Sequence, residues 1–167
     1  RNHSSAASDV YKRQVYRWSL KNGYSIVPNS QGTWPNGIDM IDDDLYVNYR
    51  GNGKITKFSS NMRKDLILRT YLNGGPDNVT AVGDELWIGG QNTDLGGLNC
   101  IPEDVIQCSM PFFIIRADRD LNILEEYNFK DVAYGGASVA YPFEDKVFIG
   151  AYKSCLLYTS PSPRDIG

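Results

Sequence analysis

The 167-residue sequence contains one histidine, three cysteines and no excess of basic residues, with a formal net charge of −3. It also lacks any run of about 18 apolar residues, the length that a membrane-spanning helix needs. Without a basic excess there is no electrostatic footprint for nucleic acid or an anionic membrane surface. We therefore expect neither a nucleic-acid partner nor a membrane span. The shortage of histidine and cysteine also makes zinc a poor candidate metal.

The two ends of the chain are expected to be foreign to the protein. One choice of codons for Asp9–Gln14, read as the reverse complement and shifted by one base, encodes Cys155–Thr159. The end segments SSAASDVYKRQ and CLLYTSPSPRD also resemble translated transposase adapters of a shotgun sequencing library. We therefore predict that residues 1–14 and 155–167 are adapter-derived and that residues 15–154 are an open reading frame from a metagenomic read.

This division changes which chemistry the chain can carry. His3, the only histidine, lies outside residues 15–154. A histidine base or ligand therefore cannot come from the predicted protein segment. Because both true ends are expected to be missing, the sequence says nothing about a signal peptide.

Apolar and polar residues alternate over short segments, which is the period of β-strands. These segments are rich in Val, Ile, Tyr, Phe and Trp and lie at 15–19, 37–41, 45–50, 54–59, 66–72, 85–90, 112–117, 122–129, 138–143 and 146–152. Clusters of Gly, Asn and Asp predict turns between them, at 42–44, 50–53, 73–77, 82–85, 117–120 and 143–146. Helical spacing is not sustained, so we predict an all-β chain.

One strand-turn-strand unit recurs three times. The copies are NGIDMIDDDLYVNY from Asn36, NVTAVGDELWIGG from Asn78 and SVAYPFEDKVFIGAY from Ser138. The first residues of the copies, which we call the repeat leads, stand 42 and 60 residues apart. A period of about 40 to 50 residues is typical of four-stranded propeller blades. An insertion near 91–111 accounts for the longer second interval. The pattern predicts a partial β-propeller of about three four-stranded blades.

The first strands of propeller blades line a central channel, so the repeat leads should meet at one small volume. Asn36, Asp77, Asn78 and Ser138 would supply carboxylate, carboxamide and hydroxyl oxygens there. Oxygen donors of this kind suit Ca²⁺. Asn before Gly and Asp-Asn after Gly-Pro are also ordinary turn and strand-entry residues, and that interpretation stays open.

At these residues the sequence resembles the six-bladed propeller superfamily that includes gluconolactonase, senescence marker protein (regucalcin) and the paraoxonase or arylesterase group. The matching motifs are WPNGIDMIDDDLYV from Trp34, GGPDNVTAVGDELWIG from Gly74 and GGASVAYPFEDKVFIGAY from Gly135. Their order matches the C-terminal half of that family, and the second and third lean towards its paraoxonase-like branch.

The resemblance implies a Ca²⁺-dependent hydrolase of lactones or esters. The calcium ligands implied are Asn36, Asp77 and Asn78, with Ser138 on the pocket wall. Trp34, just before Asn36, is a candidate for the same wall, and packing within a blade is the alternative for it. The family's other ligands and its catalytic bases would lie upstream of this chain, so no catalytic residue is assigned. Gly90-Gln91-Asn92 stands where paraoxonase-like members often carry a His-Pro pair. Two alternatives stay open: a non-catalytic binding or scaffold propeller, and a metal-independent enzyme similar to strictosidine synthase.

Two further features concern the surroundings of the expected site. Cys100 and Cys108 lie in the insertion LNCIPEDVIQCSMP, where they could form a disulfide or stay reduced. A disulfide would favour a periplasmic or secreted protein. Gly51-Asn52-Gly53-Lys54 lacks the spacing of a phosphate-binding loop and predicts a tight hairpin turn.

Overall fold

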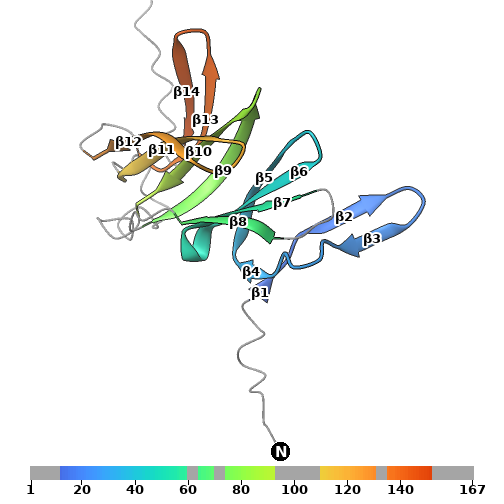
Figure 1. Ribbon diagram of the computed structural model, residues 1–167. Helices are drawn as coiled ribbons and strands as arrows, with labels where there is room; N and C mark the ends of the chain where they lie inside the picture. Colours follow the sequence, from blue (N-terminus) through green and yellow to red (C-terminus); the bar gives the residue numbers. More distant parts are fainter. Residues whose placement is uncertain (1–11, 60–63, 70–73, 93–109, 131–134, 152–167) are drawn as a thin grey trace, which may run out of the picture.

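The computed structural model describes residues 12–59, 64–69, 74–92, 110–130 and 135–151 (Figure 1). These residues form antiparallel β-sheets of two to four strands, which confirms the all-β prediction. Within these ranges there is no α-helix, only the 3-10 turn η2 (Arg50–Asn52). Consequently, the described residues include no helix with the length and apolarity to cross a membrane.

Two four-stranded sheets make up most of the described chain. Each is a simple meander, with the strand orders β5-β6-β7-β8 and β9-β10-β11-β12. The first comprises β5 (Pro35–Ile41), β6 (Asp44–Tyr49), β7 (Lys54–Phe58) and β8 (Lys64–Arg69). The second comprises β9 (Gly75–Val82), β10 (Glu85–Gln91), β11 (Phe112–Asp118) and β12 (Ile123–Phe129).

Three two-stranded sheets flank this pair. The hairpin β13–β14 (Ala137–Phe143 and Lys146–Ala151) follows the second large sheet. The hairpin β2–β3 (Tyr16–Ser19 and Gly23–Ile26) precedes the first and projects away from the remaining strands in Figure 1. The short strands β1 (Lys12–Arg13) and β4 (Gly32–Thr33) pair with each other beside it.

The main core lies between the two four-stranded sheets. Its fully buried members come from the inner strands of both sheets and include Tyr46, Ile55, Leu86, Ile88, Phe113 and Ile115. Because β6 and β10 are covered on both faces, they are buried almost along their whole length, whereas β12 is largely exposed. Burial of this apolar surface, at about 25 cal/mol per Å², holds the sheets together.

The strand predictions hold for ten segments, with shifts of a few residues at their ends. The 50–53 segment is the expected hairpin turn: β6 and β7 pair from Tyr49 with Lys54, and Gly53 has a left-handed φ of 60°. The turn predicted for 73–77 was wrong in part, because β9 already begins at Gly75, which pairs with Gln91. Proline is compatible with this early position in a strand, and Pro76 pairs with Gly90.

The first strands of successive sheets lie next to one another. Strand β5 packs on β9, and β9 and β10 pack on β13. A Cβ atom on Gly37 would lie 2.4 Å from the carbonyl oxygen of Asp77, so this close approach of β5 to β9 requires glycine. Asp39 ties the same strands further along, where its Oδ2 accepts a 2.8 Å hydrogen bond from the backbone N–H of Ala81.

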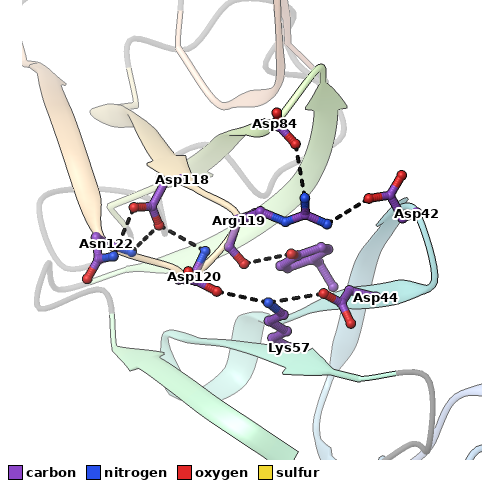
Figure 2. Close-up of polar contacts among 9 residues, drawn as sticks. Asp42, Asp44, Lys57, Asp84, Asp118, Arg119, Asp120 and Asn122 are labelled. Atoms are coloured by element: carbon purple, nitrogen blue, oxygen red, sulfur yellow. Dashed lines mark hydrogen bonds and ion pairs between the residues drawn. The ribbon is translucent and has the colours of Figure 1, made fainter.

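A second set of polar contacts fastens the two large sheets at the other end of β5. We call it the distal cluster, and Figure 2 shows its members: Asp42, Asp44, Lys57, Asp84, Asp118, Arg119, Asp120 and Asn122. Lys57 lies 3.0 Å from Asp44 and 3.0 Å from Asp120. Arg119 pairs with Asp42 at 2.8 Å and Asp84 at 3.2 Å. The β11–β12 turn is thereby attached to residues from the preceding sheet.

Candidate functional site: polar residues at the strand bulges

Each of the three successive sheets carries a register irregularity near the start of its first strand. In the β5–β6 pair it falls between Pro35 and Ile38. In the β9–β10 pair it falls where Pro76 and Val79 pair with Gly90 and Ile88. In the β13–β14 pair it falls between Ala137 and Val139. Bulges bend a strand and re-aim its side chains, and they are frequent next to active sites.

The polar residues predicted from the repeat all lie within these irregular segments. Asn36 lies in the first, Asp77 and Asn78 in the second, and Ser138 in the third. The amide Nδ2 of Asn36 donates a 2.7 Å hydrogen bond to Asp77 Oδ1. The amide Nδ2 of Asn78 donates a 3.1 Å hydrogen bond to the carbonyl oxygen of Ser138. The fold therefore joins the three repeat leads in a chain of contacts.

Asp77 is the centre of this arrangement, which we call the Asp77 cluster: Asn36, Asn48, Arg50, Asp77 and Gln91. Its side chain is only 15% exposed. Oδ2 of Asp77 accepts hydrogen bonds from Arg50 Nη1 at 3.2 Å and from Gln91 Nε2 at 2.9 Å. Both carboxylate oxygens are thus occupied by donors of the chain itself, and one of these donors carries a positive charge.

Gln91 connects Asp77 to the third sheet. It is fully buried at the end of β10, and its Nε2 also donates a 2.7 Å hydrogen bond to the carbonyl oxygen of Ala137. Its Oε1 accepts a hydrogen bond from Arg50 Nη1. Gln91 therefore satisfies both ends of its amide within the cluster and holds β13 beside β9.

Trp34 and Ser138 stand at the margin of the cluster. The Trp34 carbonyl accepts a 2.9 Å hydrogen bond from the backbone N–H of Arg50, and Trp34 has a left-handed φ of 55°. About half of Trp34 is exposed. The Ser138 hydroxyl donates a 3.3 Å hydrogen bond to the carbonyl oxygen of Gly150, within its own hairpin. Trp34 thus orients the backbone of Arg50.

The donor chemistry of the cluster and of the adjacent Asn78 fits calcium. Asn36, Asp77 and Asn78 offer hard oxygen donors. Asn48 is fully buried and donates its Nδ2 to the carbonyl oxygen of Asp77 at 3.1 Å, but its Oδ1 has no hydrogen-bond partner among the described residues. An oxygen left in this state favours a cation or a further donor. Asp77 is the only carboxylate of the cluster, and the described ranges contain no group of three or more His, Cys, Asp and Glu side chains placed so that they could hold a metal ion.

Three members of the cluster had no role assigned from the sequence: Asn48, Arg50 and Gln91. The sequence comparison did single out Gln91, because Gly90-Gln91-Asn92 stands where paraoxonase-like proteins often carry a His-Pro pair. Asn48 interrupts the apolar series Leu45-Tyr46-Val47, and a polar residue inside a buried strand was a usable signal. Arg50 stands at the edge of a turn, where sequence predicts an exposed cation. Cys100 and Cys108 lie outside the described residues.

Comparison with known proteins adds no family. No protein-family model matches the chain, and no curated protein matches it. The features of the structure that point to a function are therefore the bulges at the strand starts and the Asp77 cluster.

Proposed function

We propose that the chain is the C-terminal part of a six-bladed β-propeller related to the gluconolactonase, regucalcin and paraoxonase group. Supporting this, two complete four-stranded meanders and a hairpin follow one another, and their first strands are neighbours. The irregular segments recur at Asn36, Asn78 and Ser138, the positions that the sequence repeat marks. Residues 1–14 and 155–167 are proposed to be adapter-derived.

The function proposed for the parent protein is calcium-dependent hydrolysis of lactones or esters. The single observation that carries it is the hydrogen bond of Asn36 to the Asp77 carboxylate beside the buried Asn48, which donates to the Asp77 backbone and whose Oδ1 has no hydrogen-bond partner among the described residues. Asn36, Asp77 and Asn78 would hold the ion. When bound, calcium would supply a Lewis acid for the carbonyl oxygen of the substrate.

The other residues of the cluster position these ligands. Gln91 holds the Asp77 carboxylate from the β10 side, and the Gly37 backbone contact sets the spacing between β5 and β9. Burial of Gln91 and Asn48 keeps this side of the cluster dry, which strengthens its electrostatic interactions.

One observation favours a metal-independent alternative. Arg50 already supplies a positive charge to Asp77, so the carboxylate is satisfied without an added ion. A non-catalytic binding propeller, or an enzyme similar to strictosidine synthase, would use such a cluster only to hold the blades together.

The test uses the full-length product of the parent gene and the variant Asp77→Ala. Calcium binding is measured by titration calorimetry, and hydrolysis is measured with an aromatic ester and a lactone. We expect Asp77→Ala to reduce calcium affinity and the rate of hydrolysis by more than about 100-fold each. Loss of a residue that only hydrogen-bonds to a metal ligand typically costs about 10- to 100-fold, so a larger loss indicates a direct ligand. The control Asp84→Ala removes an exposed carboxylate of the same repeat and should change neither. Unchanged activity in Asp77→Ala would contradict the proposed role.

A further inference from the structure

The position of Arg50 is the feature that the proposed function does not use. Its Nη1 lies 3.2 Å from Asp77 Oδ2 and also contacts Gln91 Oε1. The side chain is 23% exposed, against 15% for Asp77. A guanidinium in this position is a strong partner for a carboxylate because it is always charged and its donors are planar.

We propose that Arg50 is a built-in competitor of the divalent cation: it neutralises Asp77 in the metal-free protein and must leave before the ion binds. This inference rests on the proposed calcium site. Asp77 is the only carboxylate of the cluster among the described residues. Asn36 donates to Oδ1, whereas Arg50 and Gln91 both donate to Oδ2, so an ion that binds at Oδ2 displaces one of these two donors. Arg50 is the donor with which a cation shares like charge, so electrostatic repulsion selects it.

The local structure allows the guanidinium to move while the backbone stays in place. The Arg50 backbone is held by the bond to Trp34 and by its place in η2. Its stem lies over Gly75, where an added Cβ would come within 2.6 Å of Arg50 Cγ. Partial exposure gives the head a way to solvent. Once Arg50 leaves, Gln91 still holds Asp77 and Ala137 through Nε2, so the carboxylate keeps its orientation.

Competition predicts an opposite effect of one variant on the two states of the protein. Arg50→Gln should lower thermal stability in a calcium chelator, because Asp77 loses its counter-ion. The same variant should bind calcium at least about 10-fold more tightly, because no guanidinium has to be displaced. Arg50→Lys keeps the positive charge, so its calcium affinity should be closer to that of the unchanged protein than the affinity of Arg50→Gln is.

The experiment measures calcium affinity by titration calorimetry, and stability with and without chelator, in the full-length parent protein. The matched control is Arg119→Gln, which removes the same charge from the distal cluster. Its partner Asp42 lies in the turn after β5, at the opposite end of that strand from Asn36. An affinity change of less than about 2-fold in this control, with the 10-fold gain in Arg50→Gln, supports the inference.

Three results would overturn it. Equal or weaker calcium binding by Arg50→Gln rejects competition while leaving the calcium site itself in place. Equal gains in calcium affinity for Arg50→Gln and Arg119→Gln would show that the gain comes from the change in net charge and not from the position of Arg50. Absence of binding in both the unchanged protein and Arg50→Gln rejects the proposed calcium function together with this inference.

A second measurement keeps the inference testable if Arg50→Gln does not fold. The NMR signal of the Arg50 side-chain Nε–H, assigned in the unchanged protein, should shift or broaden as calcium is added. The Arg119 signal should stay constant. An Arg50 signal that does not respond to saturating calcium overturns the inference.

Discussion

At the scale of single residues, Asp77 shows how a short polar side chain organises a site. Its two oxygens receive donors from β5, η2 and β10, three elements that are separate in the sequence. A bulge turns the Asp77 and Asn78 positions out of the regular strand alternation. The result is a carboxylate that is nearly buried yet has a partner for both oxygens.

Tyr49 gives a prediction at this scale. It is buried, its hydroxyl donates a 2.7 Å hydrogen bond to the carbonyl oxygen of Ser30, and burial raises its pKa to about 12. The pKa of Tyr49 in the folded chain lies above its ordinary value of 10.0. The buried neutral hydroxyl therefore contributes its full stabilisation of the fold below pH 10, and this contribution is lost as the pH rises through 12. Tyr49→Phe should cost about 1 kcal/mol at pH 7 and weaken the loss of stability at alkaline pH.

The measurement is denaturant unfolding at several pH values from 7 to 11.5. Tyr24→Phe serves as control, since it removes a hydroxyl from the exposed face of the β2–β3 hairpin. That control should keep the free energy of unfolding of the unchanged chain. Parallel alkaline profiles for Tyr49→Phe and the unchanged chain would contradict the prediction.

At the scale of elements, the β11–β12 turn acts as a fastener between sheets. Asp118 folds the turn on itself, since its Oδ1 accepts the backbone N–H groups of Asp120 and Asn122. The hydrogen bond from the Asn122 side chain lowers the pKa of Asp118, so the carboxylate stays charged. The turn then presents Asp120 to Lys57 and Arg119 to Asp42 and Asp84 (Figure 2).

Lys57 provides the test of this fastening. Burial lowers its pKa, but the hydrogen bonds to Asp120 and Asp44 outweigh burial, and the pKa is raised overall. The ammonium also lies 5.9 Å from the centre of the Tyr46 ring. Lys57→Met should therefore lower the free energy of unfolding by about 1.5–3 kcal/mol, the range for hydrogen bonds to charged groups.

Lys146→Met is the matched control for that change. Lys146 is largely exposed and pairs with its sequence neighbour Asp145, and such surface pairs contribute about 0–1 kcal/mol. Equal effects of the two substitutions in thermal or denaturant unfolding would show that the distal cluster does not hold the sheets together.

At the scale of the whole molecule, the described chain exposes apolar surface at both of its flanking hairpins. On β2–β3 and the turn that joins these strands, the exposed residues include Tyr16, Trp18, Leu20 and Tyr24, and on β13–β14 they include Tyr141, Phe143 and Phe148. Sheets with unpaired edges and uncovered apolar faces favour association with other chains. In the proposed complete propeller, further strands would cover these surfaces.

We therefore expect the isolated 167-residue chain to associate and to unfold without a sharp two-state transition. Sedimentation velocity and thermal unfolding followed by circular dichroism test this at several protein concentrations. The full-length parent protein, as the reference, should remain a discrete species and unfold cooperatively. A monomeric chain with one sharp, concentration-independent transition would contradict the expectation.

The sequence determined ten strand segments and the repeat, because alternation of apolar residues and turn chemistry act over neighbouring residues. Strands β1, β3 and β4 were not among the predicted segments. It also marked Asn36, Asp77, Asn78 and Ser138 as positions of interest through their spacing. The start of β9 escaped the sequence pattern, because Gly75 and Pro76 have turn character by themselves and become strand residues only by pairing with β10.

Only the tertiary structure decided which partners Asp77 has. Arg50 and Gln91 lie 27 and 14 residues from it, so their contacts depend on how β5 packs on β9 and how the bulge aims the carboxylate. Local sequence carries no record of that packing, since an arginine beside a glycine-rich turn is normally solvated. The close approach of two backbones at Gly37 brings these side chains together, and this approach gives Asp77 a counter-ion from its own chain.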